Sequence, residues 1–561
     1  MKVSDLIYKR ITIEYMEQET ESIIQQINNA SCVDDVLSAR KRYIELCEEY
    51  NTANSLSYMR YTINTIDEFY LAEKDYYDEI SPKVANLDLN YNKALINSSY
   101  LSQLKENLNP LLFKSIENAM KAMSPEIVED MVEENRLVSE YSKLMAGMEF
   151  EFRGEKMSRA QLMGYSYDDD RETRKECYEV LGRTLDEYSE QLDRIFDDLV
   201  HVRDRMAKKM GYKNFIELGY YRMNRLCYDQ KMVQQFRENV KSDFAPVVAR
   251  LRTEAAKKLG IDRFMLYDLN VIVPGGDPKP GSADEIFSAA KEMYHKMSKI
   301  TSEFFDMKLE NEAFDVESRK NKWGGGYCTV FHKYHQPFIL ANFNGSNDDV
   351  DTMTHEVGHA LNDYLIANNE YAIELGCGGM ETAETHSMGM EFFAWPYMDL
   401  FYGNQAAAYR YRHVLDAMSF IPYGTMVDAF QHIVYENPSL SPKERNDAWL
   451  QLERDFRPFI SMEGMPYLEK GTRWQYQMHI YETPFYYIDY CLAQTAAFQF
   501  LLASLNDYDD AFQKYMNLSK QGGEKAWDLL LKEVGFRSPF EEDSLKDLAT
   551  QMESLVESIK I

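Results

Sequence analysis

Apolar side chains recur at helical spacing along most of this chain of 561 residues. Over residues 12–144 the spacing is heptad-like, which is typical of packed amphipathic helices. No cluster of histidine or cysteine lies here, so we interpret residues 1–145 as an N-terminal helical lobe that acts as a scaffold, followed by a second region over residues 146–561. We predict turns between helices where the spacing is interrupted, at residues 51–54 and at Ser81-Pro82, Asn109-Pro110 and Ser124-Pro125.

Two stretches depart from the helical pattern. Residues 148–157 alternate apolar and polar side chains around Gly154, which predicts a small hairpin. Residues 323–331 and 337–343 are rich in β-branched and aromatic side chains and lead into a turn at residues 344–349. We therefore predict a mainly α fold with a small mixed β-sheet, whose edge strand lies next to the helix that follows this turn.

An edge strand can bind an extended peptide through main-chain hydrogen bonds, with little preference for the peptide's side chains. An equally good interpretation is that the glycines at 324–326 form an ordinary turn. The candidate peptide-binding residues lie at the glycine-rich start of the first strand and at the end of the second, and they are Gly325, Gly326, Tyr327, Ala341 and Asn342.

The helix after the turn contains the pentad HExxH, with His355, Glu356 and His359 as its defined positions. On a helix the two imidazoles lie one turn apart and can reach one metal ion, which in this pattern is zinc. Glu356 lies beside them, where it can accept a proton from a water molecule that the metal activates. The pentad therefore predicts a zinc site with a general base, and its surroundings have to supply a third ligand.

A third ligand is predicted from the segment 380–395. Read as a helix, it places Glu384, Ser387 and Glu391 on one face, and we take Glu384 as the ligand and Glu391 as a supporting carboxylate. Acidic residues on a helix are usually its solvated face, but the flanking methionines and aromatic residues argue for burial, where a carboxylate needs a cation or a hydrogen-bond donor. Glu381 and Glu391 are the alternatives for the third ligand.

Glu384 follows His355 by 29 residues, and the pattern E-x-x-S-x-x-x-E runs from Glu384 to Glu391. With this spacing the chain resembles the thimet oligopeptidase and oligoendopeptidase F family of zinc peptidases, most closely the shorter bacterial oligoendopeptidases of the Pz-peptidase type. The likeness extends from about residue 150 to the C-terminus. It implies one Zn²⁺ per chain with Glu384 as third ligand, and a large helical, neurolysin-like zincin fold with two lobes around a deep channel.

The C-terminal segment 478–490 carries His479, Tyr486, Tyr487 and Tyr490. Positions 479, 486 and 490 fall on one face of a helix, with Pro484 able to offset the register, and an aromatic stripe of this kind is by default core packing. The family has a histidine followed by tyrosines here, which implies that these side chains donate hydrogen bonds to the oxyanion formed during peptide hydrolysis. The interval from His479 to Tyr490 is one residue shorter than in the mammalian-type members, so either Tyr486 or Tyr487 is the functional partner.

Composition narrows the setting. A formal net charge of −30 argues against nucleic acid as a partner, because nucleic-acid affinity depends on clustered Lys and Arg. The N-terminus lacks the apolar core of a signal peptide and no segment approaches about eighteen uninterrupted apolar residues, so we predict a soluble cytoplasmic protein with no membrane partner. The seven cysteines are scattered and never form CxxC, which suggests neither a disulfide framework nor a thiolate zinc site and fits a reducing compartment.

Together these features predict a zinc-dependent oligoendopeptidase that cleaves internal bonds of short peptides, and they carry no prediction of oligomeric state. Two alternatives are a zinc carboxypeptidase or aminopeptidase on a related helical fold, and a peptide-binding protein without activity. A terminal peptidase would need a charged anchor for a peptide end, and no such anchor is evident. The intact Glu356 argues against a purely binding protein, which has no need of a general base.

Overall fold

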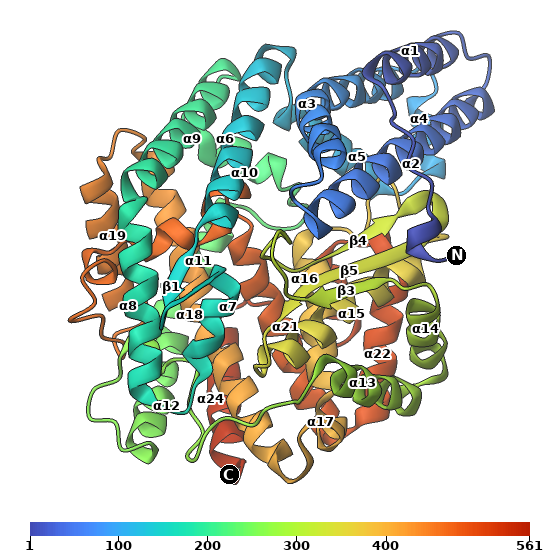
Figure 1. Cartoon of the computed structure of the whole chain (residues 1–561). Helices are drawn as coiled ribbons and strands as arrows, with labels where there is room; N and C mark the ends of the chain where they lie inside the picture. Colours follow the sequence, from blue (N-terminus) through green and yellow to red (C-terminus); the bar gives the residue numbers. More distant parts are fainter.

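The computed structural model describes residues 1–561, and helices make up most of the chain (Figure 1). The first part contains α1 (Ile13–Asn28), α2 (Val33–Ile63), α3 (Glu68–Ile96), α4 (Leu101–Asn107), α5 (Pro110–Ala122) and α6 (Val128–Gly147). The middle contains α7 (Arg159–Gly164), α8 (Arg171–Glu187), α9 (Ser189–Lys209), α10 (Phe215–Arg222), α11 (Gln230–Asn239), α12 (Ala245–Lys258), α13 (Ala283–Met297) and α14 (Lys299–Glu310). The last part contains α15 (Asp348–Ile366), α16 (Met380–Phe393), α17 (Asp399–Tyr402), α18 (Ala406–Glu436), α19 (Pro442–Phe456), α20 (Met478–Glu482), α21 (Tyr487–Asn506), α22 (Tyr508–Lys520), α23 (Trp527–Glu533) and α24 (Ser544–Ser558).

Two small sheets accompany the helices. The predicted hairpin is present as the antiparallel pair β1 (Phe150–Phe152) and β2 (Glu155–Met157). The second sheet has the order β3-β5-β4, in which β3 (Phe314–Glu317) is parallel and β4 (Tyr327–Phe331) antiparallel to the central strand β5 (Gln336–Phe343). Helix α15 follows β5 directly and packs against β5 and β4. The predicted mainly α fold with a small mixed sheet beside the HExxH helix is therefore confirmed, and β4 is an edge strand.

The turns predicted in the N-terminal part are half right. Asn109 accepts a hydrogen bond from the N–H of Leu111 and caps α5, and Ser124 caps the short turn before α6. The turn predicted at residues 51–54 is wrong, because α2 continues through it. Thr52 and Ala53 are buried there, and tertiary packing outweighs the weak helix propensity of the asparagines around them.

The turn predicted at Ser81-Pro82 is also wrong, and a side chain from another helix explains why. Pro82 lies inside α3 and has no N–H to donate to the carbonyl oxygen of Asp78, four residues earlier. The side-chain amide of Asn135, on α6, donates to that oxygen at 2.8 Å. Because this bond replaces the missing one, α3 runs through the proline without an unsatisfied carbonyl.

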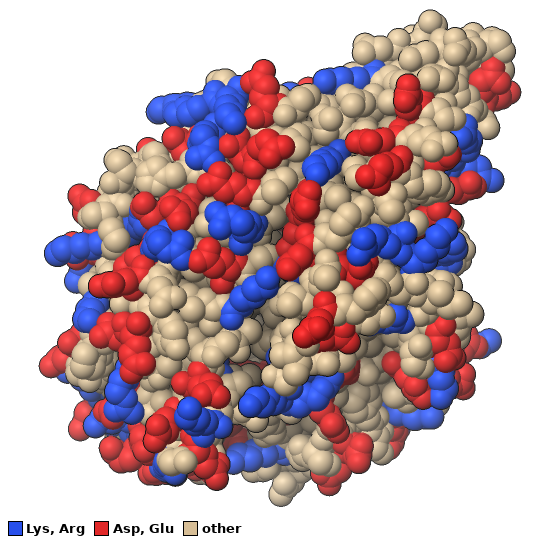
Figure 2. All heavy atoms as spheres, turned by 45° about the horizontal axis from the view of Figure 1, so that its top comes forward, with Lys and Arg blue, Asp and Glu red and all other residues tan.

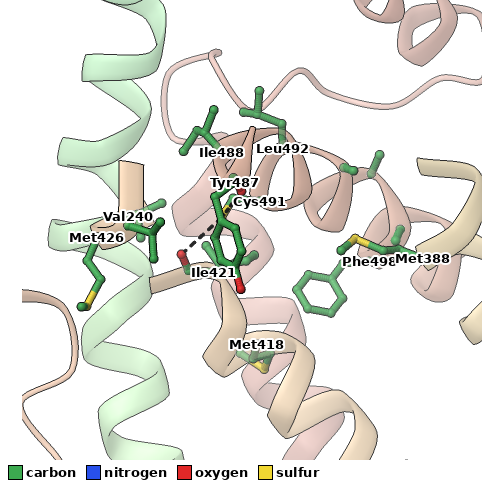
Figure 3. Close-up of a cluster of buried hydrophobic side chains, with 14 of the residues drawn as sticks. Val240, Met388, Met418, Ile421, Met426, Tyr487, Ile488, Cys491, Leu492 and Phe498 are labelled. Carbon is green, nitrogen blue, oxygen red and sulfur yellow. Dashed lines mark hydrogen bonds between the residues drawn. The ribbon is translucent and has the colours of Figure 1, made fainter. Parts of the chain in front are cut away.

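The main hydrophobic core surrounds the helices that carry the histidines and glutamates of interest. Helix α21 packs against both α16 and α18, and buried side chains from the three helices form one hydrophobic cluster (Figure 3). Helix α21 is long and apolar enough to cross a membrane, with a mean hydropathy of 1.2 over its apolar stretch. However, 67% of that stretch is buried inside the protein. Such burial is typical of a core helix in a large protein. A smaller, separate cluster is formed mainly by α1, α2, α3 and α5.

The surface carries charges of both signs. Lys and Arg lie among Asp and Glu over the face that Figure 2 shows, without a continuous basic region. This distribution agrees with the acidic balance of the chain, which has 62 basic and 92 acidic side chains.

Candidate metal centre and active site

Helix α15 places the pentad against α16. Asp348, Asp349 and Asp351 lie in its first turn, where negative charge is favourable at a helix N-terminus. Gly358 permits the close approach of α16, because a Cβ at this position would lie 2.7 Å from the Cα of Ser387. His355 and His359 therefore project from α15 toward the side chains of α16.

Three ligand-type side chains meet between these helices. The Oε2 atom of Glu384 lies 3.3 Å from Nε2 of His355 and 3.4 Å from Nε2 of His359. The three donor atoms all lie within 4.8 Å of one another, and no other group of this kind is found in the protein. Two imidazole nitrogens and one carboxylate oxygen are a ligand set typical of catalytic zinc sites. Of the three glutamates considered, the structure brings Glu384 to both histidines.

Two neighbours orient these donors. Ser387 donates a hydrogen bond to Oε2 of Glu384 at 3.0 Å, and Nδ1 of His355 lies 2.7 Å from Oε1 of Glu391. A bond from Nδ1–H of His355 to Glu391 leaves Nε2 with a free lone pair, as a metal ligand requires. Burial alone would raise the pKa of Glu391, but the hydrogen bonds of His355 and His413 outweigh it and hold that pKa below its ordinary value.

Glu356 is 8% exposed, and its Oε2 atom has no hydrogen-bond partner within the protein. Burial raises the pKa of Glu356, while the neighbouring His355 and His359 act in the opposite direction. A buried carboxylate oxygen without a donor is costly unless a ligand or water pairs with it. A Cβ built on Gly326 would lie 3.8 Å from Oε1 of Glu356, so the glycine-rich segment before β4 borders this carboxylate.

His479 lies on α20, whereas Tyr486 caps the start of α21 and Tyr487 and Tyr490 lie on it, so the interpretation as one continuous helical face is wrong. Helix α20 ends at Glu482 and α21 begins at Tyr487, because Pro484 and the positive φ of Phe485 interrupt the helical conformation between them. The bend nevertheless brings Nε2 of His479 to within 3.4 Å of the hydroxyl of Tyr490.

Tyr486 and Tyr487 point in different directions. The hydroxyl of Tyr486 donates to Oε1 of Glu384 at 2.5 Å. Tyr487 lies in the hydrophobic cluster that Figure 3 shows. Its ring packs against the rings of Phe420 and Tyr423. The structure thus brings Tyr486, and not Tyr487, to the proposed metal ligand.

Protonation suits His479 and Tyr490 as hydrogen-bond donors. Burial lowers the pKa of His479 to about 4, so its imidazole is neutral at pH 7 and keeps one N–H. Burial and the charge of Glu384 raise the pKa of Tyr490 well above its ordinary value, so its hydroxyl keeps its proton.

The candidate peptide-binding residues are divided between roles. The side-chain amide of Asn342 donates to the carbonyl oxygen of Gly325 at 2.7 Å and so fixes the glycine-rich segment. The hydroxyl of Tyr327 lies 2.6 Å from Oγ1 of Thr62 and is directed toward α2. The side chain of Ala341 is buried under the sheet. Of this set, Gly326 lies beside Glu356, and Gly325 and Asn342 shape that border.

One residue at this site escaped the sequence analysis. Nε2 of His413, on α18, lies 2.9 Å from Oε2 of Glu391. It follows the pentad by more than fifty residues, inside a largely apolar helix. No local pattern connects it with the zinc site, and only the tertiary fold, in which α21 packs against both α16 and α18, brings it there.

The chain matches two protein-family models. The model described as Peptidase M3 N-terminal domain matches residues 3–123, and the model described as Peptidase family M3 matches residues 164–273 and 279–550, more than half of the chain. The oligopeptidase PepF of Bacillus subtilis (strain 168) is 21% identical over 392 residues, which are 68% of this chain. The aligned part spans 56% of the length of PepF.

Solved structures match over the full length. Pz peptidase A, in a structure with an inhibitor, is 40% identical with a TM-score of 0.97 and 100% of both chains covered. A protein described as an oligoendopeptidase F from Bacillus anthracis str. Ames is 37% identical with a TM-score of 0.92, covering 100% of this chain and 99% of the other. These matches confirm the suspected resemblance and the helical zincin-type fold, and the chain belongs to peptidase family M3.

Proposed function

We propose that this peptidase is a zinc-dependent oligoendopeptidase that hydrolyses internal bonds of short peptides. The observation that carries the proposal is the convergence of His355, His359 and Glu384, with the unpartnered carboxylate oxygen of Glu356 beside them. The similarity to Pz peptidase A and to a protein described as oligoendopeptidase F supports the same activity.

His355, His359 and Glu384 would hold one Zn²⁺. Zinc bound in this way supplies a Lewis acid that activates water and polarises the carbonyl of the peptide bond. Glu356 accepts a proton from the attacking water and passes it to the amine of the leaving peptide. Burial raises the pKa of Glu356. Because a carboxyl with a raised pKa holds a proton more readily, one residue can act first as base and then as acid.

The donors from α20 and α21 complete the site. Tyr490 and His479 would donate to the oxyanion that forms when water adds to the carbonyl, and they are already oriented by their mutual contact. Tyr486 donates to Glu384 and so helps to hold this ligand in place. The three side chains lie on segments far from the pentad in sequence, which explains why an active site needs the whole catalytic region to fold.

The substrate would lie along the glycine-rich segment and β4, where main-chain hydrogen bonds bind peptides of many sequences. We assign the N-terminal helical lobe, residues 1–145, and the catalytic region, residues 146–561, as the two walls of the channel that would restrict the substrate to short peptides. A cytoplasmic location and the lack of a nucleic-acid or membrane partner belong to the same proposal. The acidic balance of the chain argues against nucleic acid, and the scattered cysteines without a CxxC pair fit a reducing compartment.

The test is cleavage of internally quenched peptides of graded length whose two ends are blocked by acetylation and amidation. We expect internal cleavage, identified by mass spectrometry of the products, with loss of activity after chelation and one zinc per chain in the active protein. Release of single terminal residues, and only from unblocked peptides, would favour the carboxypeptidase or aminopeptidase alternative. Binding of peptides without cleavage by the zinc-loaded protein would favour a non-catalytic binding protein.

A further inference from the structure

A chain of hydrogen bonds runs from Trp395 through His413, on α18, and Glu391 to the proposed zinc ligand His355. The indole Nε1 of Trp395 donates to Nδ1 of His413 at 2.8 Å. Nε2 of His413 lies 2.9 Å from Oε2 of Glu391, and Oε1 of the same carboxylate lies 2.7 Å from Nδ1 of His355. His413 is 3% exposed, so water does not compete for these bonds.

The direction of each bond follows from the chemistry of the donors. An indole N–H can only donate, so Nδ1 of His413 is an acceptor and the ring proton of the neutral imidazole is on Nε2. That proton is donated to Oε2 of Glu391. With one oxygen occupied and its orientation set, Glu391 presents its other oxygen to Nδ1–H of His355. Nε2 of His355 then faces Glu384 without a proton.

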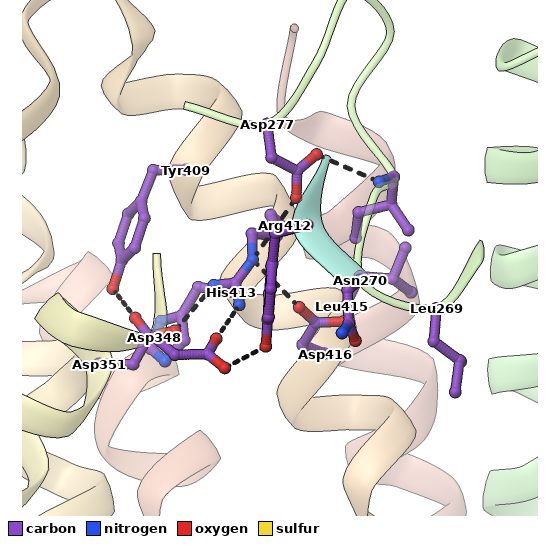
Figure 4. Close-up of polar contacts among 12 residues, drawn as sticks. Leu269, Asn270, Asp277, Asp348, Asp351, Tyr409, Arg412, His413, Leu415 and Asp416 are labelled. Atoms are coloured by element: carbon purple, nitrogen blue, oxygen red, sulfur yellow. Dashed lines mark hydrogen bonds and ion pairs between the residues drawn. The ribbon is translucent and has the colours of Figure 1, made fainter. Parts of the chain in front are cut away.

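Hydrogen bonds from residues next to His413 hold α18 against the first turn of α15. Arg412 donates to Oδ2 of Asp351 at 2.7 Å and to Oδ1 of Asp348 at 2.6 Å, and Tyr409 donates to Oδ1 of Asp351 (Figure 4). Both aspartates lie in the first turn of α15, the helix that carries His355. This part of α18 therefore contacts two aspartates of α15 and Glu391 of α16. These contacts fix the position of His413 relative to both helices.

We propose that His413 is a positioning residue for zinc, which acts through Glu391 to hold His355 in the tautomer and orientation that bind the metal. The inference rests on the proposed zinc site. It assigns to His413 a role that does not involve contact with zinc or with the substrate. Glu391 is the direct hydrogen-bond partner of His355, and loss of such a partner typically weakens metal affinity by about 10- to 100-fold. His413 acts one bond further out, so its loss should weaken zinc binding by the lower end of that range.

The test compares two amides of different reach. In His413→Gln the amide N–H2 extends to about the position of Nε2 and can still donate to Glu391, whereas in His413→Asn the amide corresponds to Nδ1 and cannot reach the carboxylate. The zinc dissociation constant is measured for each protein by competition with a chromophoric chelator at pH 7.5, together with the melting temperature of the zinc-free protein. We expect His413→Asn to weaken zinc binding by about tenfold and His413→Gln by less than about threefold.

A matched control is available on the same helix. His432 is also buried in α18, and its Nε2 lies 3.3 Å from the hydroxyl of Tyr220, away from the zinc ligands. His432→Asn should lower the melting temperature and leave the zinc dissociation constant unchanged. If His413 had a purely structural role, its substitution would likewise lower the melting temperature and leave the zinc dissociation constant unchanged.

The outcomes separate the two proposals. Failure of the wild-type protein to bind one zinc would overturn the zinc site itself. If the wild type binds zinc, equal dissociation constants for His413→Gln and His413→Asn, both unchanged or both weakened, would overturn the role of His413. Even if His413→Asn does not fold, a tenfold weakening in His413→Gln, which keeps the donor, would refute the inference.

Discussion

The hydroxyl of Tyr490 lies 3.4 Å from Nε2 of His479, although the two side chains belong to separate helices, α21 and α20. Both are at least half-buried, and both keep a proton that they can donate. A pair of neutral donors held together near a proposed zinc site is suited to binding an oxyanion. The first prediction tests this role.

Tyr490→Phe should lower kcat by about 10²- to 10³-fold, with a smaller change in KM and unchanged zinc content, because a donor to the oxyanion acts mainly on the transition state. Steady-state kinetics with an internally quenched peptide and metal analysis check it. Tyr141→Phe is a matched control, since that buried hydroxyl donates to the main-chain oxygen of Gln475. Full activity of Tyr490→Phe with a lowered melting temperature would mean that Tyr490 only packs the core.

Tyr486→Phe and Tyr487→Phe should differ. Tyr486 donates to Glu384, so its loss should reduce kcat/KM or zinc affinity by about 10- to 100-fold, because one charge-assisted hydrogen bond contributes about 1.5–3 kcal/mol. Tyr487 lies in the hydrophobic cluster, and its loss should change the melting temperature with little effect on kcat/KM. The reverse order of effects would assign the functional role to Tyr487.

Glu356→Gln should keep the fold and the zinc and lower kcat by about 10²- to 10⁴-fold, since it removes the general base and leaves the ligands in place. The comparison needs the zinc content of both proteins and kcat at saturating peptide. A zinc-loaded variant with nearly normal kcat would refute Glu356 as the base.

Glu384→Ala should lose zinc, because two histidines leave the metal with too few protein ligands. Metal analysis after gel filtration measures this directly. Glu381→Gln is the matched comparison: Glu381 is buried on the same helix, and no hydrogen bond connects it with His355 or His359. Stoichiometric zinc in Glu384→Ala would place the third ligand elsewhere.

His432 should make the protein less stable in acid. Burial lowers the pKa of His432 to about 4, against an ordinary value of about 6.5, and the nearby Asp428 offsets only part of this effect. Between about pH 6.5 and about pH 4, the imidazole of His432 is protonated in the unfolded chain and neutral in the folded protein. The free energy of unfolding therefore falls as the pH drops through this range.

Between pH 7 and pH 5 the expected loss from His432 is about 2 kcal/mol of the free energy of unfolding. His432→Gln should lack this component, as urea unfolding of the zinc-free proteins at both pH values would show. An equal loss in the variant and the wild type would mean that His432 is not the responsible group.

The sequence by itself determined the elements whose chemistry is local. The spacing of His355 and His359, the pattern from Glu384 to Glu391 and the alternation around Gly154 are set by helix and strand periodicity, which the order of residues encodes directly. The mainly α fold with a mixed sheet beside α15 followed from the same periodicity, and it is confirmed.

Tertiary structure decided whatever depends on contacts between distant segments. Pro82 does not end α3, because Asn135 from another helix supplies the missing hydrogen-bond donor. Tyr486 and Tyr487 are adjacent in sequence, and only the break between α20 and α21 decides which of them faces Glu384. His413 has no pattern that links it to the pentad, and only the fold of the whole core, in which α21 packs against both α16 and α18, brings it to Glu391. Periodicity specifies which face of a helix a side chain occupies, whereas the partner on that face is selected by packing over the whole chain.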